Sequence, residues 1–572
     1  MDILLIVHDS SAKLPSGLLN GNVNQFGDFD QCLGAERRAA SGGAGLRGKY
    51  CLASLQLRLQ GTAPAAVIRM HRLMHSNYLF TSDLDDPGHR VPRFSSVQWG
   101  VCVPSACGAH DVRAALAHRL APALAAAGLQ LEVRLDEQMC QVLEDEYWPL
   151  GTVITGRQYR EAQCVKIYDD AFKFPSMATG YLFCRDDVVG VRLSGNAIRC
   201  LSLKQNISKL VSDSSSPDDI GCVHGIRFIN SVMLILSHKS MAAMYLPFAN
   251  RTRMSLEVSE PWAVLSRAAS LYTDPFLMLS GLLSTTALLR RFDRQSSFSL
   301  VNEYISRFIR LAPSLAVLML FCTWLMPWIG RGPLWPQVVT HHADICKRTW
   351  WRNLLFVHNY FGFKDMCLTH THHVGIDAQL FAATPLAARA LVRWPRRGVL
   401  TLLALAALST LARFVVTYHY QLSNFVAYGT SVKQLFATAD HMYILPAYRA
   451  TVYIMGVVLG YLLYSAKDTI LSKAQVRAGW AFAVCALCAS FSGTVEMGTM
   501  GYVYNVSLSS HYAAVAPITW CAFFAWIIYV SHMGYHRTRY SQFRTGHLVK
   551  VAFAGRAPTG TDPTASTVRL RN

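Results

Sequence analysis

The sequence predicts an α-helical polytopic membrane protein that carries a disulfide-rich domain on its N-terminal side. First, the 572-residue chain has a mean hydropathy of +0.23 and only 16% charged residues, which is too apolar for an ordinary soluble enzyme. Second, the apolar excess lies after residue 225, in runs of about the length that a bilayer requires. Third, nine of the 15 cysteines precede residue 225, which indicates an oxidising compartment for the soluble part.

Residues 1–150 form the predicted soluble domain. The stretch PSGLLNGNVNQFGDFDQCL is rich in Gly, Asn and Asp and indicates turns, whereas residues 110–129 have a helical pattern with Pro122 near the middle. The CVPSAC stretch does not suit a zinc site, because no further Cys or His pair at short spacing accompanies it. We therefore expect disulfides with one cysteine left over, formed among Cys32, Cys51, Cys102, Cys107 and Cys140.

The remainder of the chain divides into three parts. Residues 151–224 are a polar connector with no apolar run long enough to span a bilayer, and residues 536–572 are a basic tail rich in Gly and Thr. Between them, residues 225–535 form the predicted membrane domain, with about eight spans. The apolar runs are 228–248, 263–287, 308–330, 374–392, 399–417, 448–465, 478–492 and 512–531, of which 478–492 is the shortest.

Loop charges predict the orientation of these runs. Lys and Arg gather in alternate loops, at 288–310, 393–397 and 466–477, and the positive-inside rule places such loops in the cytoplasm. Opposite loops carry glycosylation sequons at Asn250 and Asn505, which are used only on the lumenal side. This distribution also accounts for the net charge of +19, so we expect contact with anionic lipid and not with nucleic acid.

The same orientation leaves one conflict. It places the large loop 331–373 in the lumen, where Cys346 and Cys367 are a possible disulfide. It also places Arg227 in the cytoplasm, although the cysteine-rich domain that precedes it is expected in the lumen. One span should join the two, and residues 141–224 contain none.

The stretch GIRFINSVMLILSH places an arginine and a histidine on one predicted membrane helix. Arg227 begins the apolar run, and His238 follows eleven residues later, about 16 Å along a helix and close to mid-membrane. An ionisable residue at that depth is costly and is by default a functional hypothesis. The alternative is a histidine that is merely hydrogen-bonded inside a helix bundle.

Several stretches together resemble the nose-resistant-to-fluoxetine type of invertebrate membrane protein. In that family a lumenal cysteine-rich domain precedes an acyltransferase-3 membrane domain. The N-terminal resemblance rests on PSGLLNGNVNQFGDFDQCL, KYCLASLQL and QWGVCVPSACG. The membrane-domain resemblance rests on CVHGIRFINSVMLILSH, TDPFLMLSGLL, SRFIRLAPSLAVL, WWRNLLFVHNYF, MCLTHTHHVGIDAQLF and YRATVYIMGVVLGYLL.

The resemblance implies roles for the arginine–histidine pair and for one carboxylate. His238 would be the catalytic base, because imidazole can take a proton from a hydroxyl near neutral pH. Arg227 would help to hold an anionic acyl donor, because the planar fork of an arginine can clamp a phosphate. Asp377 occupies the place of the family's acidic residue, and the alternative is a carboxylate favoured by a helix N-terminus. Arg307 and Arg310 match a basic pair that would also bind the donor, or they are cytoplasmic flank charges.

Other matched residues have structural interpretations. Asp274 and Gly281 match the second-helix motif, and Gly281 would permit close helix packing. Arg449 is a substrate contact or, as we prefer, an interfacial side chain that reaches toward the headgroups. Where relatives have Trp-Tyr, this chain has His372 and His373, and we expect no metal there, because adjacent loop histidines are usually only polar. Relatives also have a span before the CxHGxR motif and about two more helices after residue 536.

The predicted function is transfer of an acyl group from a cytoplasmic donor, expected to be acyl-CoA, to a hydroxyl on a lipid or carbohydrate acceptor. The expected partners are membrane lipid and a small-molecule or lipid acceptor, and the expected location is the endoplasmic reticulum or the plasma membrane. The alternatives are a non-enzymatic lipid or xenobiotic carrier on the same bundle, or an inactive relative. Eight spans exceed what an anchor for a soluble binding module needs.

Overall fold

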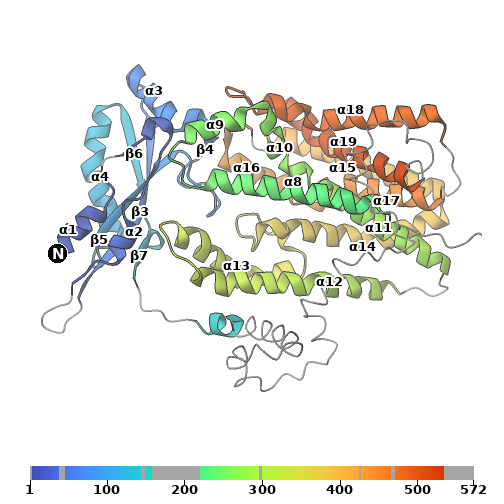
Figure 1. The fold of residues 1–572 in the computed structure, drawn as a ribbon, viewed down its shortest axis with the longest axis horizontal. Coiled ribbons are helices and arrows are strands. Elements are labelled where there is room, and N and C mark those ends of the chain that lie inside the picture. The colour runs from blue at the N-terminus through green and yellow to red at the C-terminus, as the bar shows by residue number, and fades with distance from the viewer. Residues whose placement is uncertain are drawn as a thin grey trace, which may run out of the picture.

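A computed structural model describes residues 3–13, 15–37, 45–143, 149–156, 220–294, 299–423, 427–465 and 471–533. Most of the predicted connector, including Cys164, Cys184 and Cys200, and the predicted basic tail lie outside the described residues. Within them, an N-terminal sheet domain sits against one end of a bundle of long helices (Figure 1).

The N-terminal domain is built around one long strand, β3 (Leu46–Leu59). β3 pairs antiparallel with β5 (Ser96–Pro104) on one side and with β6 and β7 on the other, and β1 joins β5 in parallel. The remaining strands of the six-stranded sheet are β1 (Asn24–Gln25), β2 (Glu36–Arg37), β6 (Leu129–Arg134) and β7 (Cys140–Val142).

Both faces of β3 are buried, and each face belongs to a different apolar cluster. Tyr50 and Leu52 face the cluster that includes α1 and α2, whereas Ala53 and Leu55 face the cluster that includes α4. This follows from the alternation of side chains along a strand. The helices of the domain are α1 (Ile3–Ser10), α2 (Phe29–Leu33), α3 (Ala65–Met74) and α4 (Ala109–Ala126).

Two disulfides fasten this sheet, and one cysteine is left over. Cys32 on α2 is bonded to Cys102 on β5, and Cys51 on β3 is bonded to Cys140 on β7. Cys107 is a free thiol. The expectation of disulfides with one cysteine to spare is confirmed, and so are the helix containing Pro122 and the early turns, where Gly17, Gly21 and Gly27 have positive φ.

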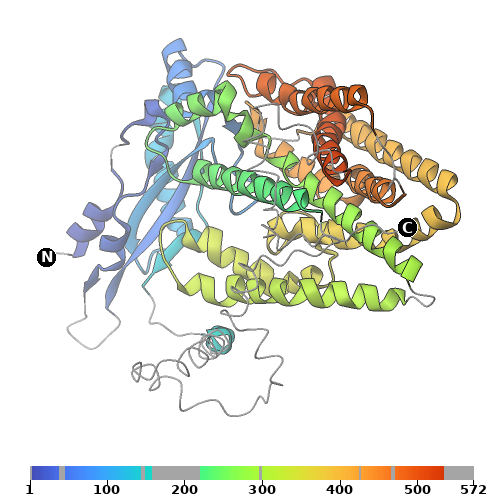
Figure 2. The same cartoon turned by 45° about the vertical axis from the view of Figure 1, so that its right-hand side comes forward.

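Within the described residues, eight long helices follow, one at each predicted apolar run. They alternate in direction along the chain, so that successive connections lie at opposite ends of the bundle (Figures 1 and 2). The helices are α8 (Cys222–Tyr245), α11 (Asp274–Arg294), α12 (Leu300–Leu320), α14 (His372–Arg393), α15 (Pro395–His419), α17 (Ala450–Ser465), α18 (Lys473–Met497) and α19 (Val506–His532).

Four segments are long and apolar enough to cross a membrane, counted among the described residues. They are the α12 segment, which continues to Trp328, and α15, α18 and α19, while α17 is a shorter apolar helix. The eight-span count therefore stays a prediction. The run 478–492, the shortest expected, lies within the 25-residue helix α18.

The second long helix begins later than the run 263–287 predicts. Residues 261–271 form short helical turns, among them α10 (Val264–Arg267), and the long helix begins at Asp274, next to Pro275. Proline favours the first turn of a helix because its missing N–H has no partner there in any case. The other short helices of the bundle are α9 (Arg251–Ser259), α13 (His341–Leu354) and α16 (Val432–Thr438).

Close packing of α11 against α17 forms the centre of the bundle. A Cβ atom at Gly281 would collide with the carbonyl of Tyr453, and one at Gly456 would collide with the carbonyl of Met278. Only glycine allows the two backbones to approach this closely, which agrees with the packing role expected for Gly281.

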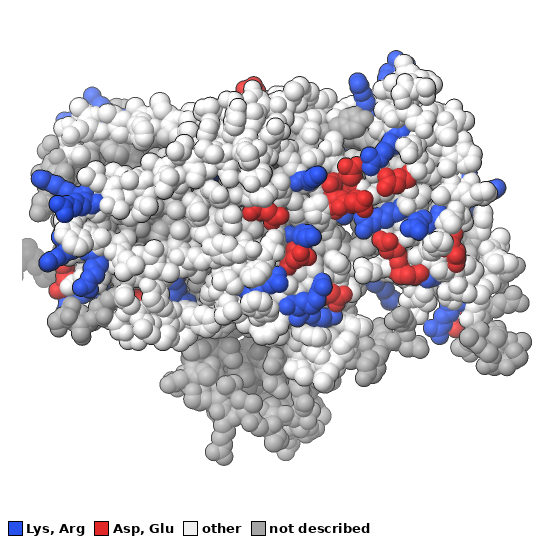
Figure 3. Space-filling view, turned by 180° about the vertical axis from the view of Figure 1, so that it is seen from behind, with Lys and Arg blue, Asp and Glu red and all other residues white. Residues whose placement is uncertain are grey.

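The two ends of the bundle differ in charge. The end opposite the N-terminal domain, here called the basic end, carries the exposed arginines of the 288–294 and 393–397 connections. Figure 3 shows Lys and Arg gathered at this end, then a wide, sparsely charged band, and then mixed charges over the N-terminal domain. Arg227 lies toward the basic end of α8, whereas Asn250 and Asn505 lie at the end that holds the N-terminal domain (Figure 1). The domain and the sequons thus share one end, as the expected orientation requires.

The N-terminal domain is attached to the bundle by backbone pairing. β4 (Phe80–Thr81) pairs in parallel with β8 (Thr430–Ser431), a two-residue strand between α15 and α16. In addition, Arg251 of α9 donates a hydrogen bond to the Phe94 carbonyl over 3.1 Å and lies over the Phe94 ring. These contacts hold the segment between β4 and β5 against the helices.

Candidate functional site

Helix α8 carries both residues of the predicted arginine–histidine pair. The helix ends at Tyr245 because Pro247 disfavours a helical conformation at the preceding Leu246, which is extended. The side chains of Arg227 and His238 line two different cavities, which follow one another along the bundle. We call these the basic-end cavity and the histidine cavity.

The basic-end cavity has a volume of about 690 Å³ and is mainly positive. Arg227 and Arg310 line it, and neither has an ion-pair partner within the described part of the chain. Its other charged residues are already paired, Arg291 with Glu303 and Arg307 with Asp377. The three arginines expected to bind the donor, Arg227, Arg307 and Arg310, therefore share one cavity.

Arg307 is more than a flank charge. It forms an ion pair with Asp377, donates a hydrogen bond to the Ser280 hydroxyl over 2.9 Å and stacks on the Phe381 ring, with Cζ 4.1 Å from the ring centroid. These contacts join α12 to α11 and α14. Asp377, expected to be catalytic, is thus ion-paired with Arg307 in the basic-end cavity. It does not line the cavity of His238.

The histidine cavity has a volume of about 660 Å³ and lies toward the N-terminal domain. Long apolar side chains form much of its wall, among them Leu234, Met241 and Phe436. Besides His238, the described residues that line it include three cations and four further histidines, but no Asp or Glu: Arg90, Arg267, Lys364, His89, His370, His372 and His373.

His373 is the residue that lines both cavities. Both of its ring nitrogens are buried, and neither has a hydrogen-bond partner among the described residues. A buried imidazole without a partner is costly unless a ligand supplies one. Sequence reasoning treated this histidine as a polar loop residue, whereas it lies in the first turn of α14, between the two chambers.

Behind the histidine cavity lies a sealed ion pair. Arg449 contacts Asp274 at 2.8 Å, and the two side chains are 1% and 0% exposed. Arg449 also donates a hydrogen bond to Thr273 over 2.7 Å and lies over the Tyr443 ring. Our preferred interpretation of Arg449 as an interfacial side chain is therefore wrong, because the side chain is completely enclosed.

A possible metal group arises from residues of the 331–373 loop. His342, Cys346 and Cys367 have ligand atoms within 4.8 Å of one another. The two cysteines are joined in the expected disulfide, so their sulfur atoms are not the thiolates that zinc requires. The HTHH histidines do not form such a group within the described part of the chain.

Both sequon asparagines are exposed and cap helices. The Asn250 side-chain oxygen accepts a hydrogen bond from Arg253 N at the start of α9, and the Asn505 oxygen accepts one from Leu508 N at the start of α19. A glycan would attach to the amide nitrogen, so this capping is compatible with modification.

Comparison with known proteins identifies the class of this membrane protein. The family model "Acyltransferase domain" matches residues 220–554, and the model "Nose resistant-to-fluoxetine protein, N-terminal domain" matches residues 3–116. The chain therefore belongs to the membrane acyltransferase-domain family and carries a nose-resistant-to-fluoxetine N-terminal domain.

Two curated relatives come from Caenorhabditis elegans. The chain is 23% identical over 498 residues to "Nose resistant to fluoxetine protein 6", which covers 80% of this chain and 58% of the relative. It is 24% identical over 307 residues to "Regulator of hypoxia-inducible factor 1", which covers 50% of this chain and 59% of the relative. The chain thus spans less than two thirds of either relative. No solved structure matches significantly.

Proposed function

We propose that this protein is an integral membrane acyltransferase that moves an acyl group from an anionic donor to a hydroxyl. The donor, expected to be acyl-CoA, enters the basic-end cavity, which faces the cytoplasm. The acceptor enters the histidine cavity from the opposite side of the membrane of the endoplasmic reticulum or the cell surface.

The observation that carries this proposal is the series of two chemically different cavities that share His373. Arg227 and Arg310 offer unpaired guanidinium groups, which suit the phosphates of a coenzyme A donor. The apolar walls around His238 suit an acceptor with a hydrocarbon part. The reacting groups would meet near His373.

In the proposed reaction, His238 is the residue that accepts and then returns the proton. His238 takes the proton of the acceptor hydroxyl as its oxygen attacks the acyl carbonyl carbon. The carbon–sulfur bond of the donor breaks as the ester bond forms. The proton then passes from His238 to the departing thiolate, so the products are an ester and a free thiol. Arg307 and Asp377 hold one another and thereby fix the wall of the donor chamber.

The test is incubation of a labelled acyl donor with membranes from cells that express each variant. His238→Ala should lower transfer about 10²–10⁴-fold, as general-base removal typically does, with unchanged expression. His224→Ala is the matched control, because His224 lies on the same helix and lines neither cavity. Full transfer by His238→Ala would remove the catalytic role.

A lipid or xenobiotic carrier remains the second candidate. It is favoured by the apolar walls of the histidine cavity and by the separation of Asp377 from His238. A carrier has no proton to move, so ligand uptake by His238→Ala would stay close to the wild-type level. No transfer by the wild type with a broad panel of acceptors, combined with retained uptake, would favour this candidate.

A further inference from the structure

The N-terminal domain inserts one segment into the membrane domain, next to the predicted acceptor. Gly88, His89, Arg90 and Val91 line the histidine cavity, although they belong to the connection between β4 and β5. Gly88 has a φ of +93°, and a Cβ atom there would collide with the Phe436 ring. A glycine is therefore required for the segment to pass this closely over α16.

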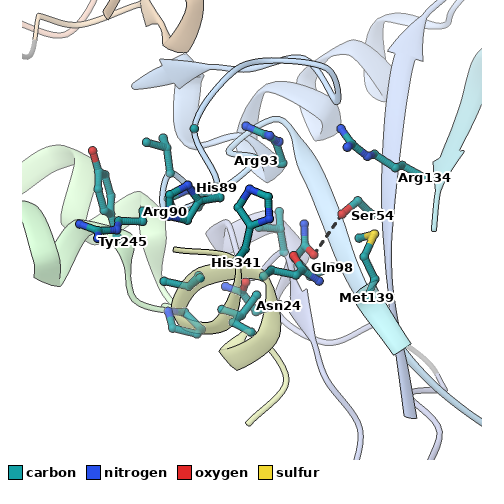
Figure 4. A pocket seen from close by; sticks show the side chains of 18 of the residues that line it. Asn24, Ser54, His89, Arg90, Arg93, Gln98, Arg134, Met139, Tyr245 and His341 are labelled. Carbon is teal, nitrogen blue, oxygen red and sulfur yellow. Dashed lines mark hydrogen bonds between the residues drawn. The ribbon is translucent and has the colours of Figure 1, made fainter. Parts of the chain in front are cut away.

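The same four residues also line a second cavity at the junction of the two domains. This junction cavity has a volume of about 290 Å³. Figure 4 shows its side chains coming from the sheet domain, from the end of α8 at Tyr245 and from the helix start at His341. The His89 ring lies 4.9 Å from the His341 ring and stacks on the His342 ring at 5.3 Å. The inserted segment thus borders both cavities, and one ligand can contact it from both sides.

Arginines dominate the charge of the junction cavity. Arg90, Arg93 and Arg251 line it without any ion-pair partner in the described residues, whereas Arg134 is paired with Asp85 and Asp136. Asp136 is the carboxylate that lines the cavity among the described residues. Burial lowers the pKa of Arg90 and of Arg93 and brings the pKa of Arg251 to about 10, which agrees with their enclosed positions.

The unsatisfied atoms around this cavity are all nitrogens that can donate. They are buried and have no hydrogen-bond partner among the described residues: Asn24 Nδ2, His89 Nε2, Arg93 Nη1, Arg251 Nε and Gln337 Nε2. A group with several acceptor oxygens and a negative charge would satisfy them together.

We propose that the junction cavity binds the anionic group of an amphiphile whose apolar part occupies the histidine cavity. The shared chemistry is that of a phosphate, sulfate or carboxylate. The inference rests on the proposed function only in calling this amphiphile the acyl acceptor. It gives the N-terminal domain a direct part in selecting the ligand, because Arg90 and Arg93 come from that domain.

The test is equilibrium binding of radiolabelled octyl phosphate to the full chain in phosphatidylcholine nanodiscs, at fixed ionic strength and without acyl donor. Arg90→Gln combined with Arg93→Gln should weaken binding about 10- to 100-fold, because hydrogen bonds to charged groups are lost. Arg113→Gln with Arg119→Gln is the matched control, with the same charge change on exposed positions of α4. If the first double variant is not monodisperse, Arg93→Gln alone should still weaken binding about tenfold.

Further measurements in the same binding assay test the proposed site. Octanol should bind equally to wild type and to both double variants, because it lacks the charge. Inorganic phosphate should displace radiolabelled octyl phosphate at least tenfold more weakly than unlabelled octyl phosphate does. Equal displacement by the two would overturn the proposal that the ligand has an apolar part. Equal binding of octyl phosphate by the wild type and by Arg93→Gln would overturn the proposal that the junction cavity binds the anionic group. Binding of octyl phosphate by the wild type does not depend on acyl transfer, so intact binding with no acyl transfer by the wild type would contradict only the acyltransferase proposal.

Discussion

The two cavities along α8 differ in whether the ion pair beside each cavity is accessible to a ligand. In the basic-end cavity the ion pair Arg307–Asp377 forms part of the wall, with side chains 10% and 20% exposed. Beside the histidine cavity the pair Asp274–Arg449 is sealed behind the wall, at 0% and 1% exposure. The Arg307–Asp377 pair can therefore contact a bound ligand. The Asp274–Arg449 pair can influence a ligand only by stabilising the surrounding structure.

The two cavities also differ in which parts of the chain supply their charged side chains. The basic-end cavity presents unpaired arginines from its own helices, α8 and α12. The histidine cavity takes His89 and Arg90 from another domain.

The largest expected effect separates the two ion pairs. Asp274→Asn leaves the guanidinium of Arg449 buried and unpaired, so the protein should lose about 3–5 kcal/mol of stability. Asp377→Asn is the same chemical change at a pair that lines a cavity, so it should cost less, about 1–2 kcal/mol. Thermal unfolding of both purified variants in detergent measures the contrast, and equal melting temperatures would refute it.

The second prediction concerns the meeting point of the cavities. His373→Phe keeps an aromatic ring but removes both nitrogens, and transfer should fall about 10²-fold, as expected when reacting groups are displaced. His370→Phe lines only the histidine cavity and serves as the matched change. An equal effect of the two substitutions, measured as initial rates with labelled donor, would place the reaction elsewhere.

A smaller effect is expected at the donor. Arg227→Ala should raise the donor KM about tenfold, which corresponds to the loss of one hydrogen-bonded charge. Arg227→Lys should raise it less, because the charge stays while the planar fork is lost. Arg393→Ala, on an exposed connection at the same end, is the control. A donor KM that is unchanged in Arg227→Ala would exclude this residue from donor binding.

The smallest expected effect is a pH dependence of domain docking. Burial lowers the pKa of His89 to about 3 and that of His342 to about 2, against an ordinary value of 6.5. In the unfolded chain both imidazoles bind protons below about pH 6.5, whereas in the folded protein they stay neutral until about pH 2–3. Their contribution to stability is therefore complete above pH 6.5 and declines as the pH falls.

Melting temperatures between pH 7.5 and 5 measure this decline. His89→Asn should flatten the dependence, because one of the two buried imidazoles is removed. His110→Asn, at an exposed position on α4, should leave the slope unchanged. A steeper dependence in His89→Asn would contradict the assignment.

The positions of the long helices and the residues that they carry could be predicted from the amino-acid sequence. Apolar runs located eight long helices, because length and hydropathy act locally along the chain. The spacing of Arg227 and His238 placed them at different depths of one helix, as the structure has them. The cysteine content indicated disulfides but left their pairing open, since five cysteines allow many connectivities.

Contacts between residues that are far apart in the chain could not be predicted and are known only from the folded structure. Arg307 and Asp377 lie 70 residues apart, and Asp274 and Arg449 lie on α11 and before α17. Neither pairing has a sequence signal, because helix packing and not chain distance brings the side chains together. The same holds for Arg90, which reaches the cavity of His238 only because β4 pairs with β8 and docks the N-terminal domain on the bundle.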